Sequence, residues 1–138
     1  MSEYVLDASA VLALLNNEPG AQRVEDILGT SVIGAVNVCE AVGKLTGAGM
    51  SIGDARMSIE LLNLEIVPFD TDLAYKAGAL LVQTRKLGLS LGDRACLALG
   101  LAQNRTVVTA EQLWSRLKID VAVEIIRPNA RALRTPDK

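Results

Sequence analysis

Four carboxylates stand out in the sequence because each lies inside an otherwise apolar segment. The segments YVLDASAV, AVNVCEAVGKL, LSLGDRACLALG and VVTAEQLW contain, in that order, Asp7, Glu40, Asp93 and Glu111. Acidic side chains are seldom fully buried unless they are paired or bound to a metal ion. Only Lys44 and Arg94 lie near them in sequence as basic partners. A divalent cation would relieve the repulsion within such a cluster, and oxygen ligands suit Mg²⁺ or Mn²⁺.

The same acids have a simpler interpretation as residues that begin helices. The spacings Asn37-x-x-Glu40, Ser90-x-x-Asp93 and Thr109-x-x-Gln112 are typical of capping boxes. Asp7 has the residue type of a turn, and Glu111 could complement a helix dipole. Helix capping and a functional site are compatible, because a cap fixes the helix start that aims the acid.

The elements that must position these acids alternate between short apolar runs and amphipathic stretches. Strands are expected at Tyr4–Leu6, Ser31–Val36, Glu65–Pro68, Thr106–Thr109 and Val121–Ile126. Helices are expected at Ser9–Leu15, Ala21–Leu28, Val38–Thr46, Ser51–Leu64, Thr71–Leu87, Ser90–Gln103 and Gln112–Leu117. Short apolar strands that alternate with helices predict an α/β fold whose parallel sheet is covered on both faces. Ligands bind at the carboxyl ends of such strands, where Asp7, Glu40 and Glu111 are expected to lie.

Composition narrows the chemistry further. The chain has 138 residues, of which 50% are hydrophobic, and this suits one domain. It contains no histidine, which excludes Ser-His-Asp catalysis, histidine zinc ligands and HExxH motifs. The net charge of −2 gives no support for a dedicated nucleic-acid binder. With the four acids set aside, 14 basic residues would face 12 acidic ones, a mildly basic remainder.

We expect one folded domain over residues 1–126 and a basic, proline-containing tail over residues 127–138. Cys39 and Cys96 lie among small apolar residues and are expected to be reduced core thiols. The N-terminus does not resemble a signal peptide, and no stretch is long and apolar enough to span a membrane. A cytoplasmic location is therefore expected.

Together, the four segments resemble those of PIN-domain proteins, most closely the VapC-type toxins of bacterial toxin–antitoxin pairs. The resemblance extends from Tyr4 to Ile126. It implies a three-layer α/β/α fold with a mostly parallel five-stranded sheet, whose first and fourth strands are adjacent at the centre. Asp7, Glu40 and Asp93 match the three nearly constant acids of the family. Glu111 stands where an aspartate is usual, which leaves the number of bound ions open.

The resemblance also implies a function. A VapC-type toxin is a metal-dependent endoribonuclease, in which one or two Mg²⁺ or Mn²⁺ ions activate the water that attacks RNA. The four acids would be both catalytic residues and metal ligands. Polar positions that match those lining the family's site, where they would orient water or phosphate, are Ser9, Asn37, Ser90 and Thr109.

Partners follow from the same resemblance. RNA would be the substrate, an antitoxin of VapB type would neutralise the protein, and a homodimer would be usual. Arg94, Arg85 and Lys86 are candidate RNA-binding residues, followed by Arg127, Arg131 and Arg134 of the tail. The apolar stripe of the Ile52–Leu64 helix is either a dimer or antitoxin surface or a part of the core.

Three rival hypotheses remain. A haloacid-dehalogenase-type phosphotransferase also begins with a strand and an aspartate, but Ser9 stands where its second acid is needed. A P-loop nucleotidase needs GxxxxGK[ST], which is missing from the sequence. The third rival is a catalytically degenerate PIN-like module that only binds other proteins, which predicts no dependence on metal.

Overall fold

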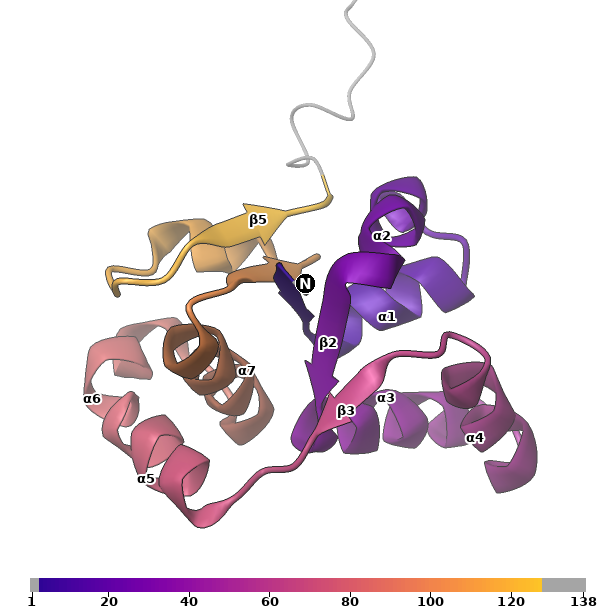
Figure 1. The fold of residues 1–138 in the computed structure, drawn as a ribbon, viewed down its shortest axis with the longest axis horizontal. Coiled ribbons are helices and arrows are strands. Elements are labelled where there is room, and N and C mark those ends of the chain that lie inside the picture. The colour runs from indigo at the N-terminus through magenta and orange to yellow at the C-terminus, as the bar shows by residue number, and fades with distance from the viewer. Residues whose placement is uncertain (1–2, 128–138) are drawn as a thin grey trace, which may run out of the picture.

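A five-stranded, entirely parallel sheet forms the centre of the molecule. The structure, a computed structural model, describes residues 3–127. The strands are β1 (Tyr4–Leu6), β2 (Ser31–Gly34), β3 (Glu65–Val67), β4 (Thr106–Thr109) and β5 (Val123–Ile125). Their order across the sheet is β3-β2-β1-β4-β5, so the first and fourth strands are neighbours at the centre, as expected (Figure 1).

Seven helices and three short 3-10 turns connect the strands. The helices are α1 (Ala8–Leu15), α2 (Ala21–Ile27), α3 (Ala35–Gly47), α4 (Ile52–Glu60), α5 (Thr71–Ala79), α6 (Leu81–Thr84) and α7 (Leu91–Gln103). The 3-10 turns are η1 (Leu28–Thr30), η2 (Arg85–Leu87) and η3 (Gln112–Arg116). In the part of the chain that the structure describes, no helix is both long enough and apolar enough to cross a bilayer.

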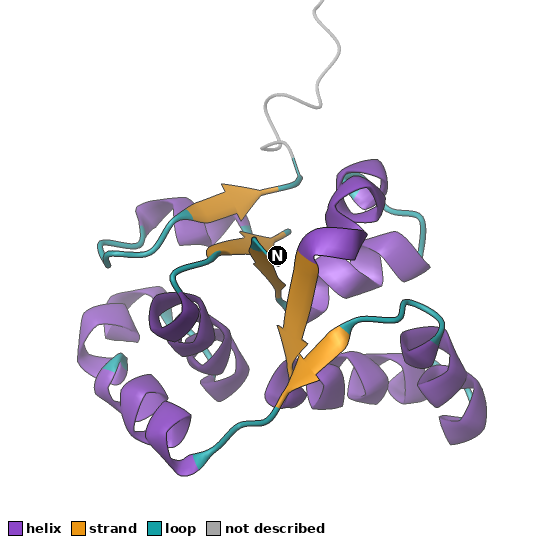
Figure 2. Ribbon diagram, viewed as in Figure 1, coloured by secondary structure: helices purple, strands orange, loops and turns teal. Residues whose placement is uncertain are grey.

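The side chains of the central strands alternate between two hydrophobic cores. In β1, Val5 packs into one core with α5, α7 and η3, whereas its neighbour Leu6 packs into the other with α1 to α4. Val107 and Val108 of β4 divide in the same way. A strand sends successive side chains to opposite faces, so continuously apolar strands require helices on both sides. The helices accordingly form two layers around the sheet, which confirms the predicted three-layer fold (Figure 2).

Several predicted elements differ from the structure at their boundaries; for example, the helix expected over 51–64 ends at Glu60, and the one expected over 112–117 is the 3-10 helix η3. β2 ends at Gly34 and α3 begins at Ala35, so Asn37 lies inside the helix and the predicted Asn37–Glu40 capping box is wrong. The helix expected over 71–87 is divided into α5, α6 and η2. Beside this division, Arg94 Nη1 of α7 donates a 3.1 Å hydrogen bond to the carbonyl oxygen of Ala77. A side chain from another helix thus bonds a carbonyl near the end of α5.

The predicted burial of the two thiols is half right. Cys96 is fully buried in α7, but Cys39 is exposed on α3. The small apolar neighbours of Cys39 do not put it in the core, because helical periodicity turns Asn37 and Ala41 inward instead. Of the predicted tail, only Arg127 falls within the described residues; Arg131 and Arg134 lie outside them.

Candidate functional site

The four predicted acids line one pocket at the carboxyl ends of the central strands. Its volume is about 100 Å³, room for a few water molecules. We call it the acid pocket, and its lining residues are Asp7, Ala8, Ser9, Leu12, Glu40, Lys44, Asp93 and Glu111. The acids come from four separate segments, and the parallel order of β2, β1 and β4 brings three of those segments to one edge of the sheet.

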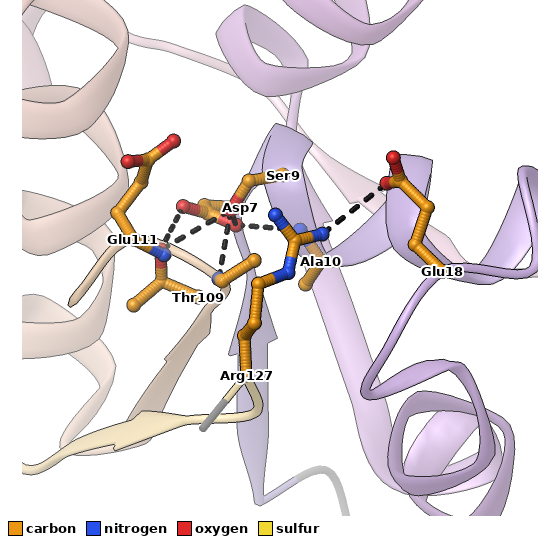
Figure 3. A network of polar contacts seen from close by, with 8 residues as sticks. Asp7, Ser9, Ala10, Glu18, Thr109, Glu111 and Arg127 are labelled. Atoms are coloured by element: carbon orange, nitrogen blue, oxygen red, sulfur yellow. Dashed lines mark hydrogen bonds and ion pairs between the residues drawn. The ribbon is translucent and has the colours of Figure 1, made fainter. Parts of the chain in front are cut away.

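Asp7 is the most firmly held of the four acids. It follows β1 directly and caps α1, where its Oδ1 accepts a 2.8 Å hydrogen bond from the backbone N–H of Ala10. Ser9 Oγ donates to the same oxygen at 2.7 Å, and Thr109 Oγ1 donates to Oδ2 at 2.5 Å (Figure 3). The carboxylate therefore has a fixed orientation, set by β1, α1 and β4 together.

Burial dominates the electrostatics of Asp7. The residue is 3% exposed, and loss of hydration raises the pKa of its carboxyl to about 6. The three hydrogen bonds oppose this rise, while the charge of Asp93 adds to it. A carboxylate that is costly to ionise and has no cationic partner among the described residues gains strongly from a bound cation.

Ser9 and Thr109 bind the aspartate as well as one another. Their hydroxyl oxygens lie 3.2 Å apart, and the backbone N–H groups of Ala110 and Glu111 donate to Ser9 Oγ and Thr109 Oγ1, respectively. Thr109 is fully buried, so its hydroxyl holds Asp7 and does not reach the solvent of the pocket. The capping box predicted for Thr109 and Gln112 does not form, because Glu111 occupies the N-cap position of η3.

Glu40 is held by a hydrogen bond from another residue of α3, Asn37. Asn37 Nδ2 donates to Glu40 Oε1 at 2.8 Å and to the carbonyl oxygen of Gly92 at 3.1 Å, which ties α3 to the start of α7. Asn37 is 1% exposed and does not line the acid pocket. Partial burial raises the pKa of Glu40, and Asp93 adds to the rise. A methyl group at position 92 would overlap the Glu40 carboxylate, so the glycine makes room for this acid.

Asp93 lies in the first turn of α7, where the predicted capping box is present. Ser90 Oγ accepts from the Asp93 N–H at 3.1 Å, and Asp93 Oδ2 accepts from the Ser90 N–H at 3.0 Å. The cap holds one carboxylate oxygen while the residue still lines the acid pocket. Capping and site membership thus occur together in Asp93.

The thiol of Cys96 in α7 is affected by the charges of three of the acids. Burial raises the pKa of Cys96, and the negative charges of Asp7, Asp93 and Glu40 raise it further. Glu111, which also lines the pocket, is exposed.

The predicted RNA-binding residues do not line the acid pocket. Arg94 is partly buried and bonds α5 through Ala77, while Arg85 and Lys86 are exposed in η2. Lys44, one turn beyond Glu40, is the basic residue that does line it. Within residues 3–127, none of the four acids forms a salt bridge.

The acid pocket suits a divalent cation by its chemistry. Its ligands would all be oxygens, Asp7 and Glu40 have raised pKa values, and one ammonium faces four carboxylates. As the side chains stand, however, residues 3–127 contain no group of three or more acids or thiols close enough together to hold a metal ion. The carboxylates share a pocket without converging on a point, and Glu40 and Glu111 have the longer side chains.

Sequence reasoning missed Gly92, whereas it named Lys44 as a basic neighbour of the acids. Gly92 directly precedes Asp93, but glycine in the first turn of a helix carries no signal for an approaching side chain from α3. Lys44 lies at the i+4 position from Glu40, a spacing that places two helical residues on one face. That spacing was a usable signal for the pocket's basic residue.

Comparisons with known proteins agree with this fold. The family model for the PIN domain matches residues 4–120. None of the curated proteins compared matches the chain. The structure of VapBC2 from Rickettsia felis bound to a promoter DNA fragment is similar, with a TM-score of 0.68 at 17% identity, covering 88% of this chain and 97% of that one.

Two further solved structures are similar over most of their length. VapBC-1 from nontypeable Haemophilus influenzae has a TM-score of 0.68 at 19% identity, covering 88% of this chain and 96% of the other. A toxin–antitoxin complex from Klebsiella pneumoniae has a TM-score of 0.64 at 14% identity, covering 83% and 92%. Identities this low indicate a shared fold.

Proposed function

Because the chain belongs to the PIN-domain family, we propose that it is a metal-dependent endoribonuclease and the toxin of a toxin–antitoxin pair. The observation that carries this proposal is the acid pocket, where four carboxylates from distant parts of the chain meet with one lysine. Clustered acids without basic partners destabilise a protein unless they bind a cation. A histidine-free chain can hydrolyse phosphodiesters in this way, since the acids need only hold the cation.

Asp7, Glu40, Asp93 and Glu111 would hold one or two Mg²⁺ or Mn²⁺ ions. When bound, the metal lowers the pKa of a water molecule and stabilises negative charge on the phosphate. The other residues of the site act on the acids themselves. Ser9 and Thr109 orient Asp7, Asn37 holds Glu40, and Ser90 holds Asp93.

Lys44 is proposed to contact a non-bridging oxygen of the scissile phosphate. Its ammonium lines the acid pocket, and it forms no salt bridge within residues 3–127. Arg94, Arg85 and Lys86 stay candidates for weaker contacts with RNA outside the pocket. Of the hydroxyls predicted to orient water or phosphate, Ser9 is the one that lines the pocket.

The direct test is cleavage of total bacterial RNA, because a toxin ribonuclease is selective and a single chosen RNA could lack its site. The purified protein is incubated with Mn²⁺ or with EDTA, and new 5′-phosphate ends are mapped by sequencing. We expect discrete new ends with wild type in Mn²⁺. They should disappear in EDTA and with Asp93→Asn, a variant that keeps the shape of the side chain. New ends that persist in the Asp93→Asn protein would contradict the proposal.

An antitoxin is the proposed protein partner, because similar structures include VapBC2 and a toxin–antitoxin complex. The helix expected over Ile52–Leu64 packs one face into the core and exposes apolar side chains on another face. Ala55 and Ile59 of α4 belong to the core, while Ile52, Met57 and Leu61 are 67%, 55% and 76% exposed. We propose that these three side chains contact the antitoxin or a second copy of the chain.

A non-catalytic interaction module is the alternative function. It is favoured by the finding that the carboxylates in residues 3–127 do not converge on a metal position. Thermal unfolding with EDTA or millimolar Mn²⁺ separates the two functions without any RNA. A ligand at 100 times its dissociation constant stabilises a protein by about 2.7 kcal/mol. Stabilisation of wild type that is lost in Asp93→Asn favours the nuclease, and no effect on either favours the module.

A further inference from the structure

A second, larger cavity lies on η3 and β5. Its volume is about 530 Å³, within the range of ligand sites. We call it the η3–β5 groove, and its lining residues are Gln112, Leu113, Ser115, Arg116, Ile125 and Arg127. It shares no lining residue with the acid pocket.

The η3–β5 groove has the opposite charge to the acid pocket. Two guanidinium groups line it, together with a hydroxyl and an amide, and no acidic residue does. Arg116 is exposed and forms no salt bridge within residues 3–127. Arg127 pairs with Glu18 at 3.3 Å (Figure 3). Guanidinium groups bind phosphate oxygens in a bidentate manner, so this is a surface suited to phosphate.

Two consecutive residues just after β4 line different cavities. Glu111 lines the acid pocket and the next residue, Gln112, lines the groove. On the neighbouring strand, the Ile126 N–H donates to the carbonyl oxygen of Thr109 at 2.9 Å, and Arg127 follows directly. The basic groove therefore begins within one or two residues of the groups that hold Asp7.

We propose that the η3–β5 groove binds backbone phosphates of single-stranded RNA next to the bond that is cut. This inference rests on the proposed function, because it extends that site. A pocket with four acids repels RNA, so binding requires cations beside it. With 3% aromatic residues the chain has little means of base stacking, and phosphate contacts must supply most of the affinity.

The carboxylate of Glu18, which pairs with Arg127, would compete with phosphate for that guanidinium group. The side chains of Arg127 and Glu18 are 33% and 42% exposed, and such surface ion pairs stabilise a protein only weakly. A phosphate group can therefore replace the carboxylate of Glu18. Removing that carboxylate with Glu18→Gln should tighten RNA binding, whereas changes to the arginines should weaken it.

The test measures binding without cleavage. A fluorescein-labelled oligouridine of twelve nucleotides is titrated with the full chain in EDTA, and polarisation gives the dissociation constant over a range of salt concentrations. Arg116→Glu should weaken binding by about tenfold or more, and Arg116→Ala should lower the salt slope by about 0.7. The matched control is Lys118→Glu, an exposed residue two positions away that does not line the groove and should have little effect.

Equal dissociation constants for the Arg116→Glu and Lys118→Glu proteins would overturn the inference, as would a wild type that does not bind the oligouridine. A groove that serves an acidic segment of a protein partner would give the first of these results. Cleavage of total RNA in Mn²⁺ judges the proposed function separately. If wild type cleaves RNA but Arg116 does not affect binding, the groove proposal fails and the nuclease proposal stands. If binding depends on Arg116 but no RNA is cleaved, the groove proposal stands and the nuclease proposal fails.

Discussion

Thr109 Oγ1 donates a hydrogen bond of 2.5 Å to Asp7 Oδ2, across two adjacent central strands and 102 residues of sequence. The bond places the end of β4 against the acid that ends β1, and the same threonine oxygen accepts the Glu111 N–H. One buried hydroxyl thus orients Asp7 and anchors the backbone that carries Glu111. Burial raises the pKa of Asp7 to about 6, so the ionisation of this carboxyl can be followed through the dependence of stability on pH.

Stability without metal should fall as the pH rises. The folded pKa of Asp7, about 6, lies above its ordinary value of 3.8. The neutral carboxyl therefore stabilises the fold fully below pH 3.8, and this contribution is lost as the pH rises through 6. The complete loss corresponds to about 3 kcal/mol at 1.36 kcal/mol per pKa unit. Urea unfolding in EDTA from pH 3.5 to 7 measures it, and Asp7→Asn should remove this part of the slope. Parallel slopes for the two proteins would contradict the pKa.

Thr109→Val should raise the pKa of Asp7 further. The threonine hydrogen bond stabilises the ionised carboxylate and so holds its pKa down against the effect of burial. Without that bond the midpoint of the pH dependence should move above 6, and the fold should lose about 1–3 kcal/mol at neutral pH. Thr109→Ser keeps the hydroxyl and is the control. A midpoint that stays in place with valine would show that Ser9 and Ala10 suffice.

Gly92→Ala should weaken metal binding and leave the metal-free fold intact. The added methyl group would overlap the Glu40 carboxylate, a flexible end that can move aside, and alanine favours the helix by about 1 kcal/mol. We expect an unchanged or higher melting temperature in EDTA and a smaller rise on addition of Mn²⁺. Gly53→Ala in α4 is the matched control, since nothing lies within 4 Å of its added methyl group. An equal Mn²⁺ response in both variants would mean that Glu40 does not bind the metal.

Leu61→Lys should prevent an association that uses the outer face of α4. Leu61 is 76% exposed and contributes little buried surface to the monomer, so the variant should fold normally. Light scattering after size-exclusion chromatography reports the oligomeric state, and co-purification with a co-expressed candidate antitoxin tests the proposed partner. Tyr75→Lys on α5, with 77% exposure, is the control for an apolar residue on a different face. Wild-type behaviour of the Leu61→Lys protein in both assays would remove α4 as an interface.

The sequence was sufficient for features that depend on local pattern. Asp7 could be placed because an acid ends an apolar strand, and the Ser90–Asp93 cap because its spacing is specific. It was insufficient where a neighbour in space decides. Asn37 has the spacing of a cap but lies within α3, because the helix begins two residues earlier. The sequence alone does not indicate that Gly92 leaves space for the Glu40 carboxylate, or that Arg116 and Arg127 line one groove.

The order of the strands has a consequence for the synthesis of the protein. β1 is made first, yet its two neighbours in the sheet are β2 and β4, and β4 comes about 100 residues later. Until translation passes residue 111, Asp7 lacks the Thr109 contact and Glu111 does not yet exist. A chain still growing on the ribosome, or one cut short within α7, has no assembled site. The ribonuclease proposed here would therefore be inactive toward its own messenger until translation has passed β4.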